Sequence, residues 1–252
     1  MYYSDEIIKK LNNEYEEIIS ISVLSNSKYN YANNLIKYQN IKIEKDAQEY
    51  LNFGFLRRLS IIKRCIENVF KTHPPSQKET LSHSERIDLS IYIQSFVINT
   101  WGALDCLCWV LVKHYNINIH KNDISISNKK FKTKLSENSR NDINEYINEC
   151  KKWIDNLKDR RDRLAHKTPL YVPNVIKNFD EYNNLEKEKI YYASNGNVEK
   201  LNETSLKQKD LEHNAMFYTS SYDSEQILIH PQMIADYKTI IEIANKFLIE
   251  KL

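Results

Sequence analysis

Glycine and proline are scarce in this sequence, with three and five residues among 252. Glycine supplies the positive-φ turns, and proline many of the breaks, that a fold of numerous short strands requires. The composition therefore disfavours an all-β protein. The three glycines are isolated from one another, so the chain has no glycine-rich phosphate loop and no Gly-x-Ser-x-Gly nucleophile elbow.

The chain also has few cysteines and no long apolar run. Its four cysteines are too widely spaced for a disulfide scaffold, and its histidines show no paired spacing with cysteines or acids that suggests zinc. We therefore expect no metal and no cofactor. No stretch approaches the roughly 18 consecutive apolar residues of a membrane span. The N-terminal residues resemble no export signal, so we expect a cytoplasmic protein without membrane contact.

An excess of one charge is absent too. The 36 basic and 34 acidic residues leave a formal charge of +2, so any contact with nucleic acid must come from a local patch. Hydrophobic residues make up 41% of the chain, which is enough for a globular core.

Apolar residues at steps of three and four predict helices along most of the chain. The segment 84–115 is apolar around most of its circumference, which places it in the middle of a bundle. A polar stretch, 116–140, is expected to be a loop with at most one short helix. The other expected helices cover residues 4–24, 31–38, 44–70, 141–166 and a final segment that begins at Pro231.

Residues 170–230 have a different character, with short apolar runs separated by polar residues. We expect strands here, at 170–172, 190–192, 216–218 and 227–229, with a turn at 195–197 between two of them. The fold class that follows is mainly all-α: a single domain, 1–252, with four to five principal helices and a small β-containing insertion before the last helix. Its parts are a core of about 44–170 plus 231–250, an N-terminal helical extension at 1–40, and the insertion at 174–230.

The end of the helix 141–166 carries an arginine in an unexpected place. Continuing its apolar stripe by four residues from Leu157 leads to Arg161. Removing a guanidinium from water is costly unless it meets a carboxylate, a phosphate or several other acceptors. We therefore expect Arg161 to have a partner, and Asp105 in the central helix is the obvious candidate.

Asp162 and His166 are four residues apart, so they lie on one flank of that helix. The carboxylate can hold the imidazole in one orientation, and both the carboxylate and the helix C-terminus favour the charged imidazolium. Arg161, Asp162 and His166 together would form a compact cationic site that suits a phosphate.

The residues Arg161 to His166 match the R-x(4-6)-H motif of HEPN domains, with a polar residue directly after the arginine. The segment from Asn99 to Asp105 also resembles the central helix of bacterial HEPN-like proteins. The resemblance covers roughly residues 44–170 and the last helix. It implies a metal-independent endoribonuclease of toxin or defence type, which acts as a homodimer in which two copies of the motif meet in one cleft.

The resemblance also implies roles for individual residues. His166 would be the general acid or base, Arg161 the phosphate clamp and Asp162 the group that orients His166. RNA's own 2′-hydroxyl would be the nucleophile, leaving a 2′,3′-cyclic phosphate. Asn99 and Asp105 are candidates for the cleft or for its support. Candidates for RNA contact are Lys158, Arg160, Arg163, Lys167 and Tyr171.

Two other interpretations remain open. The chain could be a non-catalytic HEPN-like module that binds a nucleotide or a partner protein, such as an antitoxin or a regulator. It could also be a structural bundle in which Arg161 bridges to a core carboxylate, His166 caps the helix end, and the neighbouring charges form a solvated face.

Overall fold

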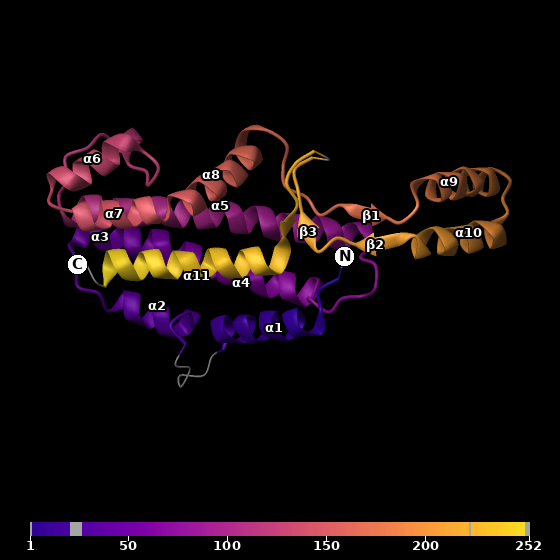
Figure 1. Cartoon of the computed structure of the whole chain (residues 1–252), viewed down its shortest axis with the longest axis horizontal. Helices are drawn as coiled ribbons and strands as arrows, with labels where there is room; N and C mark the ends of the chain where they lie inside the picture. Colours follow the sequence, from indigo (N-terminus) through magenta and orange to yellow (C-terminus); the bar gives the residue numbers. More distant parts are fainter. Residues whose placement is uncertain (1, 21–26, 222, 250–252) are drawn as a thin grey trace.

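The computed structural model describes residues 2–20, 27–221 and 223–249. Over these residues the chain is mainly α-helical, with two small two-stranded sheets, which confirms the expected fold class (Figure 1). The helices are α1 (Asp5–Ile19), α2 (Tyr31–Gln39), α3 (Lys45–Glu49), η1 (Tyr50–Phe55), α4 (Leu56–Thr72), α5 (His83–His114), η2 (Lys121–Asp123), α6 (Lys129–Glu137), α7 (Asn141–Glu149), α8 (Lys151–His166), α9 (Phe179–Ser194), α10 (Val198–Asp210) and α11 (Ile229–Leu248). The strands are β1 (Asn174–Ile176), β2 (Glu212–Asn214), β3 (Phe217–Tyr218) and β4 (Ile227–Leu228).

Helix α5 is the centre of the bundle, as its all-round apolar sequence predicts. It starts at a capping box, in which Ser82 accepts from the backbone of Glu85 and the Glu85 side chain accepts from the backbone of Ser82. Helices α4, α8 and α11 pack on α5, and α1 covers α4 and α11. By length and composition α5 could cross a membrane, but 61% of its apolar window is buried inside the bundle.

The segment 44–70, expected to be one helix, contains a π-helical turn. Helix α3 passes into the π-helix η1, which continues as α4. Gly54 lies in this turn, and a Cβ at that position would be 2.8 Å from the Sγ of Cys106 on α5. The turn therefore brings its backbone close to the central helix at a position where only glycine fits without a shift of Cys106.

The expected single helix 141–166 is in fact two helices. The chain breaks at Cys150, whose ψ of 0° is outside the helical range, and α8 runs at an angle to α7 (Figure 1). The buried residues of α8 are Ile154, Leu157 and Arg160. After Leu157 the next buried residue is three positions further on, at Arg160, and not four positions further on, at Arg161. The buried arginine is therefore Arg160 rather than the predicted Arg161.

The insertion contains more helix than predicted. The expected strand at 190–192 is wrong, because these residues belong to α9, and the turn at 195–197 joins α9 to α10 rather than two strands. Gly196 supplies the positive φ, 67°, that this turn needs. The two helices form a hairpin that projects from the bundle (Figure 1).

Strands β1 and β2 lie at the base of this hairpin, directly before α9 and directly after α10. Strand β1 pairs with β2, and β3 pairs with β4, both antiparallel. The expected strand at 170–172 forms only an isolated bridge between Tyr171 and Thr219. At the N-terminus, α1 ends at Ile19, and the part of the expected helix at 21–24 lies outside the described residues, as does position 250 of the expected core.

Candidate functional site

The Arg161–His166 motif forms the last turns of α8, where this helix lies against α5. The side chains of Arg161 and Asp162 are 26% and 28% exposed, and His166 is exposed at the final position of the helix. The motif is therefore on a surface rather than in the core.

Arg161 is held mainly by an aromatic ring. Its Cζ lies 4.9 Å from the centroid of the Trp101 ring on α5, a cation–π contact, and its Nη1 lies 2.9 Å from Asp162 Oδ1. Its Nε is buried without a hydrogen-bond partner among the described residues. The expectation that Arg161 takes an apolar core position is wrong, because the step of three after Leu157 leaves it beside the buried stripe.

The carboxylate of Asp162 is engaged by two cations. Lys158 Nζ donates to Oδ2 at 2.6 Å, and Arg161 contacts the other oxygen. Burial opposes ionisation of Asp162, but the hydrogen bond from Lys158 and the charges of Arg161 and His166 outweigh it, so its pKa lies below the ordinary value. Its effect on His166 in the described structure is electrostatic rather than a hydrogen bond. Within one chain, Asp162 therefore does not hold the His166 imidazole in place through a hydrogen bond, contrary to the sequence prediction.

Asp105 is the acid of the central helix α5 that interacts electrostatically with Arg161. Hydrogen bonds from Ser125 and Trp101 and the charges of Arg161 and Arg58 favour its ionised form, but burial raises its pKa to about 6. Its Oδ1 is buried without a hydrogen-bond partner in the described part of the chain. The expected Arg161–Asp105 ion pair does not form, although the two groups interact electrostatically across the α5–α8 contact.

A second arginine, Arg58 on α4, contacts the polar residue Asn99 on α5. Arg58 Nη1 donates to Asn99 Oδ1 at 3.1 Å, and Asn99 Nδ2 donates to the backbone carbonyl of Ser95. Sequence reasoning missed Arg58. The available signal was Gly102, an isolated glycine inside a helical pattern, where glycine is unfavourable unless packing or function requires it. A Cβ on Gly102 would lie 2.5 Å from the Arg58 guanidinium.

The arginine that is buried is Arg160. Its Nη1 donates to Asp236 Oδ2 at 2.7 Å and its Nη2 to Oδ1 at 3.0 Å, and Nη1 also reaches the Tyr218 hydroxyl at 3.0 Å. Burial disfavours the charge, but Asp236 outweighs burial and holds the Arg160 pKa above its ordinary value. Arg160 therefore has no surface to offer to RNA, contrary to the prediction.

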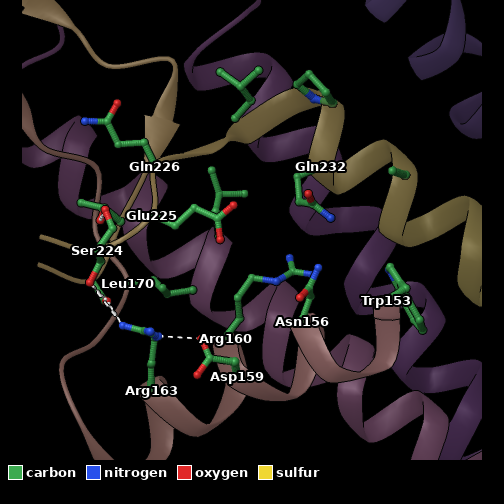
Figure 2. Close-up of a pocket in the computed structure, with 16 residues that line it drawn as sticks. Trp153, Asn156, Asp159, Arg160, Arg163, Leu170, Ser224, Glu225, Gln226 and Gln232 are labelled. Carbon is green, nitrogen blue, oxygen red and sulfur yellow. Dashed lines mark hydrogen bonds and ion pairs between the residues drawn. The ribbon is translucent and has the colours of Figure 1, made fainter. Parts of the chain in front are cut away.

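A cavity of about 450 Å³ opens beside Arg160, on a different flank of α8 from Asp162. Figure 2 shows Asn156, Asp159 and Arg163 around it, with Glu225 and Gln232 on the facing segments. Arg163 donates to Asp159 at 2.8 Å and to the hydroxyls of Ser220 and Ser224 at 3.0 and 3.2 Å. None of the three motif residues lines this cavity.

The other predicted RNA contacts are spread around the end of α8. Lys158 is paired with Asp162, and Lys167 is exposed just after the helix. Tyr171 is half-buried and is held through its backbone by Thr219. Lys158 and Lys167 are thus the predicted cations that remain beside the motif.

Metal ligands do not gather at this site. Within 2–20, 27–221 and 223–249, no group of three or more histidine, cysteine and acidic side chains is arranged to hold a metal ion. Comparisons of the chain with models of protein families, with curated proteins and with solved structures found no match.

Proposed function

We propose that this protein is a metal-independent endoribonuclease of HEPN type, with Arg161, Asp162 and His166 as its catalytic residues. The observation that carries the proposal is the placement of an exposed imidazole and a partly exposed guanidinium on the last turns of α8. His166 is free to meet a substrate, and Arg161 is fixed in place by Trp101 and Asp162. The toxin or defence context comes from the sequence resemblance.

In this mechanism the RNA 2′-oxygen attacks the adjacent phosphorus and the bond from phosphorus to the 5′-oxygen breaks. His166 either removes the proton of the 2′-hydroxyl or supplies one to the leaving 5′-oxygen. Arg161 stabilises the added negative charge on the phosphate oxygens in the transition state. The products are a 2′,3′-cyclic phosphate and a 5′-hydroxyl. Asp162, through its bond to Arg161, sets the orientation of the guanidinium.

One copy of the motif provides only one histidine, whereas the reaction needs both a base and an acid. We propose that a second copy supplies the other group, as the sequence resemblance implies. Helix α5 offers a surface for this contact, since Ile87, Ile91 and Ile98 are 47%, 53% and 39% exposed and their spacings of four and seven place them on one stripe. The same stripe leads to Asp105 beside Arg161. The proposed homodimer would act in the cytoplasm, where an antitoxin or regulatory protein could control it.

The second candidate function is a non-catalytic module that binds a nucleotide or a partner protein. The cavity beside Arg160 favours it, because Arg163 and two serine hydroxyls line that cavity. Such groups commonly bind phosphate oxygens. In this alternative His166 has no chemical role.

The test is cleavage of a 5′-labelled single-stranded RNA in the presence of EDTA. The wild type is expected to cut it, while His166→Ala and Arg161→Ala each lose at least about 100-fold in rate. His83→Ala, which removes another exposed histidine, is the matched control and should retain activity. All variants should keep the wild-type melting temperature within a few degrees. If the wild type cuts no RNA, or if His166→Ala cuts at the wild-type rate, the enzyme proposal is wrong.

A further inference from the structure

Arg58 lies across the central helix in a position that depends on a glycine. A Cβ at Gly102 would be 2.5 Å from both Cζ and Nη1 of Arg58, closer than any side chain allows. Glycine is disfavoured in the middle of a helix, so a close contact of this kind is a physical reason for its presence. Gly102 thus provides a place on α5 for the Arg58 guanidinium.

The charge of Arg58 is not matched by an acid at this position. It donates a hydrogen bond to the neutral amide of Asn99 and also interacts with the Cys106 thiol, and Asn99 is itself anchored to the Ser95 carbonyl. Among the described residues, no carboxylate lies within 4.0 Å of the Arg58 guanidinium. Asp105 is close enough for the charge of Arg58 to lower its carboxyl pKa, but the two do not form an ion pair.

Arg161, which comes from α8, approaches the same turn of α5. Its guanidinium lies over Trp101, and Trp101 and Gly102 are consecutive residues in the helix. Asp105 follows Trp101 by four residues and Gly102 by three, so all three lie on one face of α5, and guanidiniums from α4 and α8 both approach this face. Asp105, the acid on this face, has one buried oxygen that lacks a hydrogen-bond partner among the described residues.

From this arrangement we infer that Arg58 is a second phosphate-binding residue, which holds a phosphate of single-stranded RNA next to the one bound by Arg161. This inference rests on the proposed function, since it places RNA on the face that carries the motif. The planar fork of Arg58 suits two phosphate oxygens, and Asn99 holds the fork in place. Arg58 is part of no sequence motif, and only the packing of α4 on α5 brings it to this face.

The test measures RNA binding apart from cleavage. A fluorescent single-stranded oligoribonucleotide is titrated with the His166→Ala protein at several salt concentrations, with and without Arg58→Ala, Arg58→Lys or Gly102→Ala. Arg57→Ala is the matched control, because Arg57 is the preceding residue, is exposed, and lies over the Phe53 ring at 4.7 Å rather than over α5. Thermal melts confirm that each variant is folded.

Arg58→Ala is expected to weaken binding about tenfold and to reduce the slope of log K against log salt by about 0.7, the value for one phosphate contact in a single strand. Gly102→Ala should also weaken binding, because the new methyl group displaces the Arg58 guanidinium although the charge of Arg58 is kept. The affinity of Arg58→Lys should lie between those of the His166→Ala parent and Arg58→Ala. Arg57→Ala should change neither quantity by a comparable amount.

The outcomes separate this inference from the proposed function. If Arg58→Ala binds like Arg57→Ala while the wild type cleaves RNA, the role of Arg58 is wrong and the nuclease stands. If Arg58→Ala loses affinity but the wild type never cleaves, RNA binding by Arg58 stands and the nuclease falls. If the His166→Ala protein binds no RNA at any salt concentration, the inference is overturned.

Discussion

Arg160 and Asp236 form a buried two-point ion pair that joins α8 to α11. Their side chains are 5% and 0% exposed. Asp236 Oδ1 also accepts hydrogen bonds from Trp153 at 2.8 Å and Gln232 at 2.7 Å. Nearly every hydrogen-bonding position of this carboxylate is therefore occupied, as a buried charge requires. The pair fixes α8 on the bundle and with it the direction in which Arg161 and His166 point.

Removing one partner of this pair should destabilise the fold strongly. Arg160→Ala leaves Asp236 buried and uncompensated, so we expect a loss of about 3–5 kcal/mol in the free energy of unfolding. Arg161→Ala, which removes a partly exposed neighbour, should cost about 1 kcal/mol or less. Urea unfolding followed by circular dichroism measures both. Equal losses for the two variants would mean that Arg160 is not the core arginine.

The buried histidines should make stability depend on pH. His230 and His73 are fully buried, and burial lowers the pKa of His230 to about 3 and lowers that of His73 as well. Between the folded and unfolded pKa values the unfolded chain binds more protons. Stability is therefore fully present above about pH 6.5 and falls as the pH drops toward 3, by roughly 2 kcal/mol from His230 alone between pH 7.5 and 5.

Urea unfolding at pH 7.5, 6 and 5 tests this dependence. His230→Gln removes one titrating group, so its curve of stability against pH should be flatter than that of the wild type over this interval, whatever its absolute stability. A variant curve parallel to the wild type would show that His230 does not carry the effect. His120→Gln, at an exposed position, is the control that should leave the slope unchanged.

The π-helical turn should not tolerate a larger residue at Gly54. In Gly54→Ala the new methyl group meets Cys106 Sγ at 2.8 Å, and such overpacking typically costs about 1–3 kcal/mol. Removing the sulfur should relieve the clash, so the double variant Gly54→Ala with Cys106→Ala should lose less stability than the two single effects added together. Strict additivity in a thermal-unfolding cycle would contradict this packing account.

The proposed dimer should depend on the isoleucines of α5. Ile91→Glu and Ile98→Glu place charges in the contact and should convert a dimer to a monomer, with loss of RNA cleavage. Ile36→Glu on α2, where the residue is 55% exposed, should change neither property. Sedimentation-velocity experiments at several concentrations measure the state. A wild type that sediments as a monomer while it cleaves RNA would rule out the shared site.

Periodicity predicted the helical class of the fold well, because long apolar stripes are encoded locally. The central position of 84–115 followed from its all-round apolarity, and the described helix, His83–His114, agrees with it. The strand at 190–192 was wrong because a short apolar run with two tyrosines suits either structure. In the fold these residues belong to the projecting helix α9, where Ile190 and Tyr191 are each 64% exposed.

The position of each arginine around α8 could not be predicted from the sequence, for a reason of geometry. A helix stripe advances by three or four residues, and the break at Cys150 changes the direction of α8, so the choice between Arg160 and Arg161 could not be made from spacing. Asp236 was a missed signal, since it is an acid within the apolar stripe of the last helix. Arg58 could not be placed against Gly102 without the packing of α4 on α5.

The most direct test of the central claim is the chemical end formed on a defined RNA oligonucleotide incubated with the purified protein in EDTA. Mass spectrometry of the fragments identifies that end. The account predicts a 2′,3′-cyclic phosphate paired with a 5′-hydroxyl, formed by the wild type and the His83→Ala variant and lost with His166→Ala. Intact RNA after prolonged incubation with the wild type, or the same fragments from His166→Ala, would contradict it.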